Sequence, residues 1–478
     1  MKRDDEYDVT LDAFAFEGKS VTRIDGLVIF VHGGVPGDTV RIRIATTKKK
    51  FAEADVLNVL SPSPLRVEPQ CRYFGTCGGC KWQHVAYQAQ LDFKRQNVVD
   101  ALERIGGFRG IQVNPTLGSE TVYYYRNKME FSFGDRWLTR EELTLRSAQP
   151  DDSNTAARFA LGLHIPERFD KVLDIHDCRL QSETSSGILN AIRKFCLGRN
   201  LPIYSTVTHS GYLRNIVIRE GTRTGERMVN IVTYDDRPEV MTSLTARLLS
   251  DFPGVTTIVN NITARLSQVA VGDTERVYHG PGFITEQIGI RRYRISANSF
   301  FQTNTAQAER LYDIARLQAK LRNTDILFDL YSGTGTIALH MADEVKEVVG
   351  IESVESAVED AKRNASMNNV TNCTFILGDL KDKLTSDTGW LLRHPKPDVL
   401  IIDPPRAGMH EKVVAEVIGL APRRIVYVSC NPATQARDLK LMCEKGEYAI
   451  DGVQPVDMFP HTYHIENVAA LARTNPGS

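Results

Sequence analysis

The spacing of apolar and polar residues changes twice along the chain, and each change marks a different kind of structure. Over the first 60 residues, short runs of alternating apolar and polar positions are separated by glycines. Such a pattern is typical of a small β-barrel with tight turns. The segment Ser61-Pro62-Ser63-Pro64 then breaks the periodicity, so we predict a first domain over residues 1–63. Its strands are predicted over Tyr7–Phe16, Val21–Ile24, Leu27–Val31, Thr39–Ala45 and Phe51–Leu60.

The middle of the chain begins with one clear helical segment and then becomes mixed. Val85–Ile105 has helical spacing, and Gly106-Gly107 follows it in the manner of a C-terminal cap. Residues 120–290 combine strands and short helices without a repeat, and the polar segment 136–158 is predicted to be an exposed, mobile loop. We therefore predict a mixed α+β domain over residues 64–290, whose helix 85–107 packs on the domain that follows.

From about residue 291 the pattern becomes one of apolar strands alternating with helical stretches. This alternation is typical of a parallel, doubly wound sheet, so we predict a Rossmann-like domain over residues 291–478 and a multidomain α/β chain overall. Ligands of such sheets bind beyond the carboxyl ends of the strands. The strands are predicted over 325–330, 347–351, 373–377, 398–402 and 424–428.

Composition and charge narrow the class of protein. The 478 residues are 42% apolar and 24% charged, as in ordinary globular proteins. No run reaches the roughly 18 apolar residues of a membrane span, and no signal-peptide pattern follows Met1, so we expect a cytoplasmic protein without membrane contact. The net charge of −1 gives no overall attraction to a polyanion, but residues 19–50 carry seven basic and two acidic residues and predict a local basic face.

A glycine-rich turn and two acidic residues predict a nucleoside cofactor. The first strand of the last domain runs into Asp329-Leu330-Tyr331-Ser332-Gly333-Thr334-Gly335, a turn that alone fits a structural connection equally well. Glu352, about 20 residues further on, ends the second strand where it would accept hydrogen bonds from ribose hydroxyls. Asp379 follows the third strand, where it would meet an adenine amino group. The chain lacks a Gly-Lys-Ser phosphate loop, which favours S-adenosylmethionine over a nucleoside triphosphate.

Two residues at the ends of later strands, and one further along the chain, predict covalent chemistry. Asp403 follows the fourth strand and is held by Pro404-Pro405, although it could instead cap a helix. Cys430 follows the fifth strand, beside the predicted methyl donor. Thiolate attack on C6 of a pyrimidine would make C5 nucleophilic; the alternative is a buried packing cysteine. Glu466 is the candidate base for the C5 proton, although its spacing also fits an exposed helix carboxylate.

Four of the eight cysteines predict an inorganic group. Cys71, Cys77 and Cys80 form a dense cluster, and Cys178 could supply a fourth thiolate from far along the chain. Four thiolates bind either a [4Fe-4S] cluster or a structural zinc ion, and the lack of two paired Cys-x2-Cys knuckles favours iron–sulfur. The remaining cysteines and three histidines are interpreted as structural residues: Cys196, Cys373, Cys443, His84, His461 and His464.

Taken together, these motifs resemble those of the RNA uracil-5-methyltransferases, in particular the ribosomal-RNA branch with an N-terminal TRAM domain and an iron–sulfur cluster. The resemblance extends over nearly the whole chain. It implies that Cys430 is the nucleophile and Glu466 the base. It also implies that Gln302, Tyr331, Glu352 and Asp403 bind S-adenosylmethionine or frame the methyl transfer, and that Cys71, Cys77, Cys80 and Cys178 bind [4Fe-4S]. The motifs that carry it are Cys71-x5-Cys77-Gly78-Gly79-Cys80 with Trp82-Gln83-His84, Ser299-Phe300-Phe301-Gln302-Thr303-Asn304, Asp329–Gly335, Asp403-Pro404-Pro405-Arg406, Ser429-Cys430-Asn431-Pro432 and His464-Ile465-Glu466.

The same resemblance implies an RNA substrate. Ribosomal RNA is favoured because the tRNA-specific branch lacks the barrel and the cluster. A tRNA enzyme is the alternative substrate class. Two further alternatives are an amino-group methyltransferase that uses Asp403-Pro404-Pro405 and an RNA-binding module with a vestigial methyltransferase fold. We expect a monomer. Phosphate contacts are predicted for basic residues of the barrel and of the middle domain, unless these charges only solvate a surface: Arg41, Arg43, Lys48, Lys49, Lys50, Arg126 and Lys128.

Overall fold

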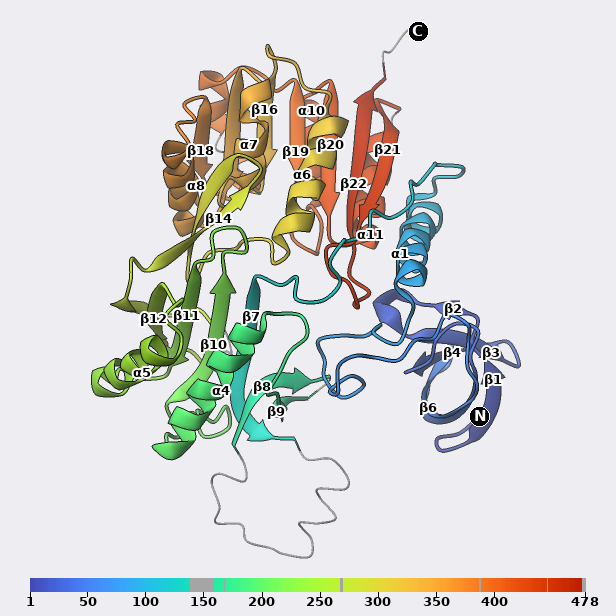
Figure 1. Cartoon of the computed structure of the whole chain (residues 1–478). Helices are drawn as coiled ribbons and strands as arrows, with labels where there is room; N and C mark the ends of the chain where they lie inside the picture. Colours follow the sequence, from blue (N-terminus) through green and yellow to red (C-terminus); the bar gives the residue numbers. More distant parts are fainter. Residues whose placement is uncertain (138–158, 167, 267–269, 387, 445, 475–478) are drawn as a thin grey trace, which may run out of the picture.

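The computed structural model describes residues 1–137, 159–166, 168–266, 270–386, 388–444 and 446–474, which form three bodies (Figure 1). Nearly all of the segment predicted as a mobile loop, residues 138–158, lies outside the described residues. No helix among the described residues has both the length and the apolar character needed to cross a membrane.

The first body is a six-stranded sheet with strand order β1-β5-β6-β4-β3-β2. Alternation along β5 places Ile42 and Ile44 in its core and Arg41 and Arg43 on its outer face, as the pattern predicts. The predicted strand 7–16 is interrupted, because Leu11 turns inward and its amide donates to Asp38 O at 3.0 Å. The strands are β1 (Glu6–Thr10), β2 (Ala13–Phe14), β3 (Ser20–Ile24), β4 (Leu27–His32), β5 (Thr39–Thr47) and β6 (Phe51–Ser61).

Helix α1 (Tyr87–Ala101) follows the first body along the chain and packs on the last one. It continues as a wider turn over Leu102–Gly106, and Gly107 ends it with a left-handed φ of 75° and an amide bonded to Leu102 O. The predicted cap is therefore confirmed. Val98 and Leu102 are buried in the same core as residues of the last sheet, so α1 packs on that sheet.

The middle body is a seven-stranded sheet with strand order β13-β12-β11-β10-β7-β8-β9. Helices α4 (Glu183–Gly198) and α5 (Pro238–Asp251) bury their apolar sides in one core with its strands (Figure 1). The strands are β7 (Lys128–Arg136), β8 (Phe159–Ile165), β9 (Arg168–Asp174), β10 (Leu213–Glu220), β11 (Arg227–Thr233), β12 (Thr257–Ile262) and β13 (Thr274–His279).

A two-stranded hairpin, β14 (Phe283–Ile288) and β15 (Arg291–Ser296), follows the middle sheet. The domain boundary predicted after residue 290 falls in the turn of this hairpin. Ile284 and Tyr293, one from each strand, pack in the core that the last sheet shares with its helices. The same core also contains Met228 and Val259 of the middle sheet, so the hairpin packs between the two sheets.

The last body is a seven-stranded sheet with strand order β18-β17-β16-β19-β20-β22-β21 and cores on both faces. Its first five strands are parallel, as predicted: β16 (Ile326–Leu330), β17 (Glu347–Glu352), β18 (Cys373–Leu377), β19 (Val399–Ile402) and β20 (Arg424–Ser429). The antiparallel hairpin β21 (Tyr448–Val456) and β22 (Glu466–Arg473) completes the sheet. The helices are α6 (Thr305–Ala319), α7 (Thr336–Met341), α8 (Glu355–Met367), α9 (Leu380–Thr385), α10 (Glu411–Gly419) and α11 (Pro432–Cys443), with short helices over Ala342–Glu344 and Thr388–Arg393.

Candidate functional site

The glycine turn after β16 is closed by Glu352 at the end of β17. The Gly333 amide donates to Glu352 Oε2 at 3.0 Å. The turn packs tightly against β18, because a Cβ on Gly335 would lie 2.8 Å from the Phe375 ring. Gly333 has a left-handed φ of 52° and open space beside its Cα. The carboxyl edge of the sheet therefore presents a hollowed backbone beside an acidic side chain, where a ribose could lie.

Two buried polar atoms in this turn have no partner among the described residues, namely Asp329 Oδ1 and Ser332 Oγ. Burial and the neighbouring Asp403 raise the pKa of Asp329 to about 8, and burial raises the pKa of Asp403 to about 7. Unpartnered buried polar groups are rare, and a catalytic or ligand-binding role is one explanation for them. A molecule with positive groups, such as S-adenosylmethionine, fits this pair of carboxyl groups.

The other predicted cofactor residues surround the same edge. Tyr331 has a left-handed φ of 69°, and burial together with the nearby Asp379 raises its pKa to about 12. Asp379 is exposed and caps α9, because its Oδ1 accepts from the Lys381 amide at 2.8 Å. Only its second oxygen is left for a ligand. Gln302 is 9% exposed, and its main-chain carbonyl accepts from Asn127 Nδ2 at 2.9 Å.

Cys430 and Glu466 are brought together by the register of β20 and β22. Ser429 pairs with Asn467 in this antiparallel ladder. Cys430, which follows Ser429, therefore lies opposite Glu466, which precedes Asn467. Burial and the nearby Asp403 raise the pKa of Glu466 well above its ordinary value. Glu466 is not the helix carboxylate that its spacing also allowed.

The surroundings of Cys430 act on its thiol in opposite directions. Burial and the facing Glu466 raise the pKa of Cys430 to about 11, whereas the guanidinium of Arg406 works against this rise. Arg406 is held near the thiol because Asn431 Nδ2 donates to its carbonyl at 3.0 Å. Sequence reasoning quoted Arg406 within a motif but gave it no role, although a cation directly after Pro404-Pro405 at this edge was a usable signal.

The four predicted ligand cysteines, Cys71, Cys77, Cys80 and Cys178, all line one cavity, together with Phe74 and Leu163. All four are free thiols, and burial raises the pKa of Cys77 to about 11 and that of Cys80 to about 12. Within the described ranges, no three His, Cys, Asp or Glu residues are close enough together to bind a single metal ion. The four thiols share this cavity, and their assignment to a [4Fe-4S] cluster stays a prediction.

The predicted phosphate-binding residues of the barrel fall into two groups. Arg41 donates to both carboxylate oxygens of Asp8 at 2.8 and 2.9 Å, and Arg43 pairs with Glu6 at 3.0 Å, across β1 and β5. Arg41 and Arg43 would have to exchange these exposed ion pairs for phosphate contacts. Lys48–Lys50 form the exposed end of the β5–β6 hairpin, and the described part of the chain places no acidic partner on them.

The two predicted residues of the middle body lie nearer the last sheet. Arg126 places its guanidinium 5.7 Å from the centre of the Phe459 ring, in the loop that precedes Glu466. Lys128 is half-buried, and burial and the neighbouring Arg219 lower its pKa to about 8. Arg219 was missed by sequence reasoning. It is 3% exposed and donates to Ser299 O at 2.5 Å, which fixes the segment leading to Gln302.

Comparison with known proteins gives one consistent result. A family model described as tRNA (Uracil-5-)-methyltransferase matches residues 265–474, and the TRAM domain model matches residues 2–57. An uncharacterized RNA methyltransferase of Porphyromonas gingivalis is 44% identical over 96% of this chain and 98% of its own length. Another from Chlorobaculum tepidum is 45% identical over 94% of this chain and 92% of its own length. The crystal structure of Pyrococcus abyssi tRNA (uracil-54, C5)-methyltransferase with S-adenosyl-L-homocysteine matches with a TM-score of 0.74 and 30% identity, covering 98% of this chain and 100% of that one.

Proposed function

The chain belongs to the RNA uracil-5-methyltransferase family with an N-terminal TRAM domain, and we propose that it methylates C5 of a uridine in ribosomal RNA through a covalent bond between Cys430 and C6. The observation that carries this proposal is the position of Cys430 opposite Glu466, at the sheet edge that also holds Asp329, Glu352 and Asp403. A nucleophile and a base at the edge where the methyl donor binds are what C5 methylation requires.

Each residue has a separate part in the reaction. The Cys430 thiolate adds to C6 of the uracil, and the electron pair of the C5=C6 bond moves onto the C4 carbonyl. S-adenosylmethionine, when bound, supplies the methyl group that C5 takes. Glu466 then accepts the C5 proton, and the electrons of that C–H bond rebuild C5=C6 as Cys430 leaves. The raised pKa of Glu466 makes its carboxylate a stronger base than that of an exposed glutamate.

The cofactor residues divide according to the part of S-adenosylmethionine they would meet. Glu352 is suited to the ribose hydroxyls, and Tyr331 with the free oxygen of Asp379 to the adenine. Asp329 and Asp403 are suited to the positive groups of the methionine part. Gln302, in the segment between β15 and α6, is proposed to bind S-adenosylmethionine or to frame the methyl transfer.

The four cysteines of the cavity are proposed to bind a [4Fe-4S] cluster with a structural role, because methyl transfer moves no net electrons. A cluster would link the segment near residue 75 to that near residue 178, which the chain otherwise joins through packing and hydrogen bonds. Anaerobically purified protein should contain about four irons and matching sulfide per chain. Stoichiometric zinc without sulfide would contradict the assignment.

Transfer RNA is the second candidate substrate, and a specific observation supports it. The Pyrococcus abyssi protein, a tRNA enzyme by its title, covers 98% of this chain. The presence of the barrel does not by itself separate the two RNA classes, although the sequence-based choice of ribosomal RNA depended on it.

Nucleoside analysis of treated RNA tests the activity and the substrate together. Unmodified ribosomal RNA and tRNA transcripts are incubated separately with the protein and S-adenosylmethionine, then digested. 5-Methyluridine from the ribosomal transcript supports the proposal. 5-Methyluridine from tRNA alone would show that tRNA is the substrate. A base methylated on an amino nitrogen would indicate the amino-group chemistry, and unmethylated but bound RNA would indicate a binding module.

A further inference from the structure

The loop of residues 457–465 between β21 and β22 determines where the proposed base lies. Val456, the last residue of β21, pairs directly with Glu466, the first residue of β22. The loop begins with Asp457, directly after Val456, and ends with Ile465, directly before Glu466. Both of its ends are therefore next to the Val456–Glu466 pair. No donor in the described part of the chain is hydrogen-bonded to that carboxyl. Its position therefore depends on the main chain of this hairpin.

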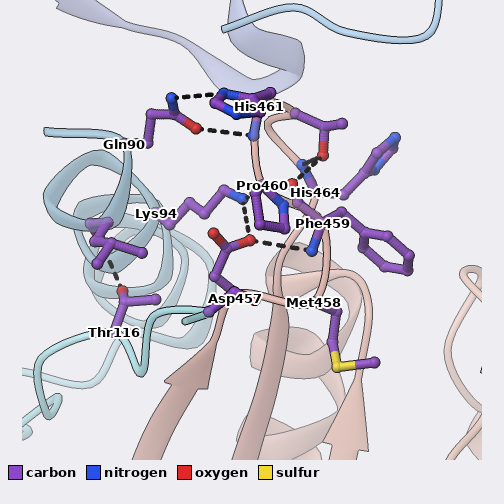
Figure 2. A network of polar contacts seen from close by, with 12 residues as sticks. Gln90, Lys94, Thr116, Asp457, Met458, Phe459, Pro460, His461 and His464 are labelled. Carbon is purple, nitrogen blue, oxygen red and sulfur yellow. Dashed lines mark hydrogen bonds and ion pairs between the residues drawn. The ribbon is translucent and has the colours of Figure 1, made fainter. Parts of the chain in front are cut away.

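A buried ion pair fixes the first end of the loop to helix α1 (Figure 2). Lys94 Nζ donates to Asp457 Oδ1 at 2.6 Å, and neither side chain is exposed. The same ammonium donates to the Phe459 carbonyl at 3.1 Å, and the Phe459 amide donates to Asp457 Oδ1 at 3.0 Å. Tyr87 Oη donates to Asp457 Oδ2 at 2.8 Å. Each oxygen of the buried carboxylate therefore has a donor.

A second contact from α1 fixes the middle of the loop. Gln90 Oε1 accepts from the His461 amide at 2.9 Å, and Gln90 Nε2 lies 3.2 Å from His461 Nδ1 (Figure 2). The His461 carbonyl in turn accepts from the amides of Lys81 and Trp82, both at 2.9 Å. Lys81 directly follows Cys80, so the cysteine-rich segment and α1 hold the same residue of the loop from two sides.

The energetics of such a network favour a positioning role. A buried ion pair gains little net stability, because the two charges lose their hydration, but it strongly disfavours any arrangement that leaves one charge unpaired. A long hairpin loop has many conformations in the absence of such contacts. The Lys94 and Gln90 contacts select one of them.

We propose that Lys94 and Gln90 are positioning residues for Glu466, and that their contacts with Asp457 and His461 hold the carboxyl where it reaches the C5 proton. This inference rests on the proposed role of Glu466. Neither Lys94 nor Gln90 is hydrogen-bonded to Cys430, Asn431 or Arg406, and Arg406 meets the loop at a different residue, with His464 Nδ1 at 3.5 Å. Loss of the clamp should therefore slow removal of the C5 proton more than addition of the thiolate.

The test replaces the ion pair by apolar side chains of similar size, Lys94→Met/Asp457→Leu, because such replacements usually preserve folding. With uridine RNA, turnover should fall by about tenfold or more and a methylated covalent protein–RNA species should accumulate. With 5-fluorouridine RNA, which cannot lose a C5 proton, adduct formation should stay within about twofold of wild type. Iron content should equal that of the wild type, which separates the effect from loss of a cluster.

Thr116→Val is the matched control, because Thr116 Oγ1 donates to the Leu91 carbonyl of the same helix and not to the Asp457 or His461 side chains (Figure 2). It should behave as wild type. Wild-type turnover of the double variant, an equal loss of adduct formation and turnover, or the same accumulation in Thr116→Val would overturn the inference. If the double variant does not fold, Tyr87→Phe is tested in its place and should show a smaller change in the same direction. If Tyr87→Phe shows no such change, the inference is also overturned.

Glu466→Gln serves as the reference in the same assay. If Glu466→Gln accumulates the methylated adduct and the clamp variants do not, only the positioning role fails. If Glu466→Gln accumulates no adduct, the proposed role of Glu466 itself fails.

Discussion

Burial and the facing Glu466 carboxyl both raise the pKa of the Cys430 thiol, because the two groups lie at the ends of neighbouring antiparallel strands. A thiolate and a carboxylate side by side oppose each other, and the raised pKa of Glu466 favours its protonated form, yet the reaction needs a thiolate first and a carboxylate later. The conflict disappears once the sulfur is bonded to C6, because a thioether carries no charge. The geometry therefore favours an order of events in which Glu466 works as a base only after Cys430 has formed its bond.

This order gives the two residues different phenotypes. Cys430→Ala should abolish methylation and covalent adduct formation, because the thiol opposite Glu466 is the proposed nucleophile. Glu466→Gln should form the adduct and accept the methyl group but retain the C5 proton, so a methylated protein–RNA species should accumulate. Denaturing electrophoresis with labelled S-adenosylmethionine distinguishes the two. Methylation by Cys430→Ala at near wild-type rate would exclude the covalent mechanism.

Glu466 should also lower the stability of the protein at high pH. Its pKa in the folded protein lies well above the ordinary value of 4.5, so the folded state keeps a proton that the unfolded chain releases above about pH 4.5. The contribution of this group to stability is fully present below that pH and is lost as the pH rises through the folded pKa. Glu466→Gln should therefore unfold at higher denaturant concentration than wild type at pH 8, and the gain should shrink at pH 5. An equal difference at both pH values would show that the buried carboxyl does not titrate as described.

Arg406 should set the reactivity of Cys430. Its guanidinium is the group that opposes the rise of the thiol pKa to about 11. Arg406→Gln should raise that pKa further, and each unit of increase removes about tenfold of the thiolate at a given pH. The rate of adduct formation with 5-fluorouridine RNA, measured against pH, should shift to higher pH in the variant. Arg406→Lys, which keeps the charge, is the matched control, and an unchanged pH profile of Arg406→Gln would remove Arg406 from the activation of the thiol.

The sequence predicted those parts of the molecule that depend on local pattern. Periodicity and turn residues predicted the five parallel strands, the cap of α1 at Gly107 and the succession of short strands along the barrel. The hairpin β21–β22 was not predicted, because its loop of residues 457–465 is held by contacts with α1 some 360 residues away, such as Lys94 with Asp457. No local pattern carries that information.

The pairing of basic side chains with acidic ones could not be predicted from the sequence either. Seven basic residues between 19 and 50 predicted a basic face, but Arg41, Arg43 and Lys19 each have an acidic partner on a neighbouring strand. Those partners, such as Asp8, come from a part of the chain outside the counted window. Only the strand register brings them together, so a count along the sequence overestimates the free positive charge.

The end of the β5–β6 hairpin is the part of the barrel best suited to contact RNA. Lys48, Lys49 and Lys50 are exposed there without acidic partners in the described chain, whereas the charge of Arg41 is balanced by Asp8. Each phosphate contact releases counterions, so the loss of one contact lowers the slope of log affinity against log salt by about 0.7 to 0.9. Replacing the three lysines by Ala should weaken RNA binding and reduce this slope by about two, while binding of S-adenosylmethionine is unchanged. The control Asp8→Asn/Arg41→Gln removes an ion pair without changing the net charge, and should leave the slope as it is. A salt titration that gives equal slopes for the triple-Ala variant and the wild type would exclude this hairpin from the RNA-binding surface, and would assign recognition to residues near the site such as Arg126.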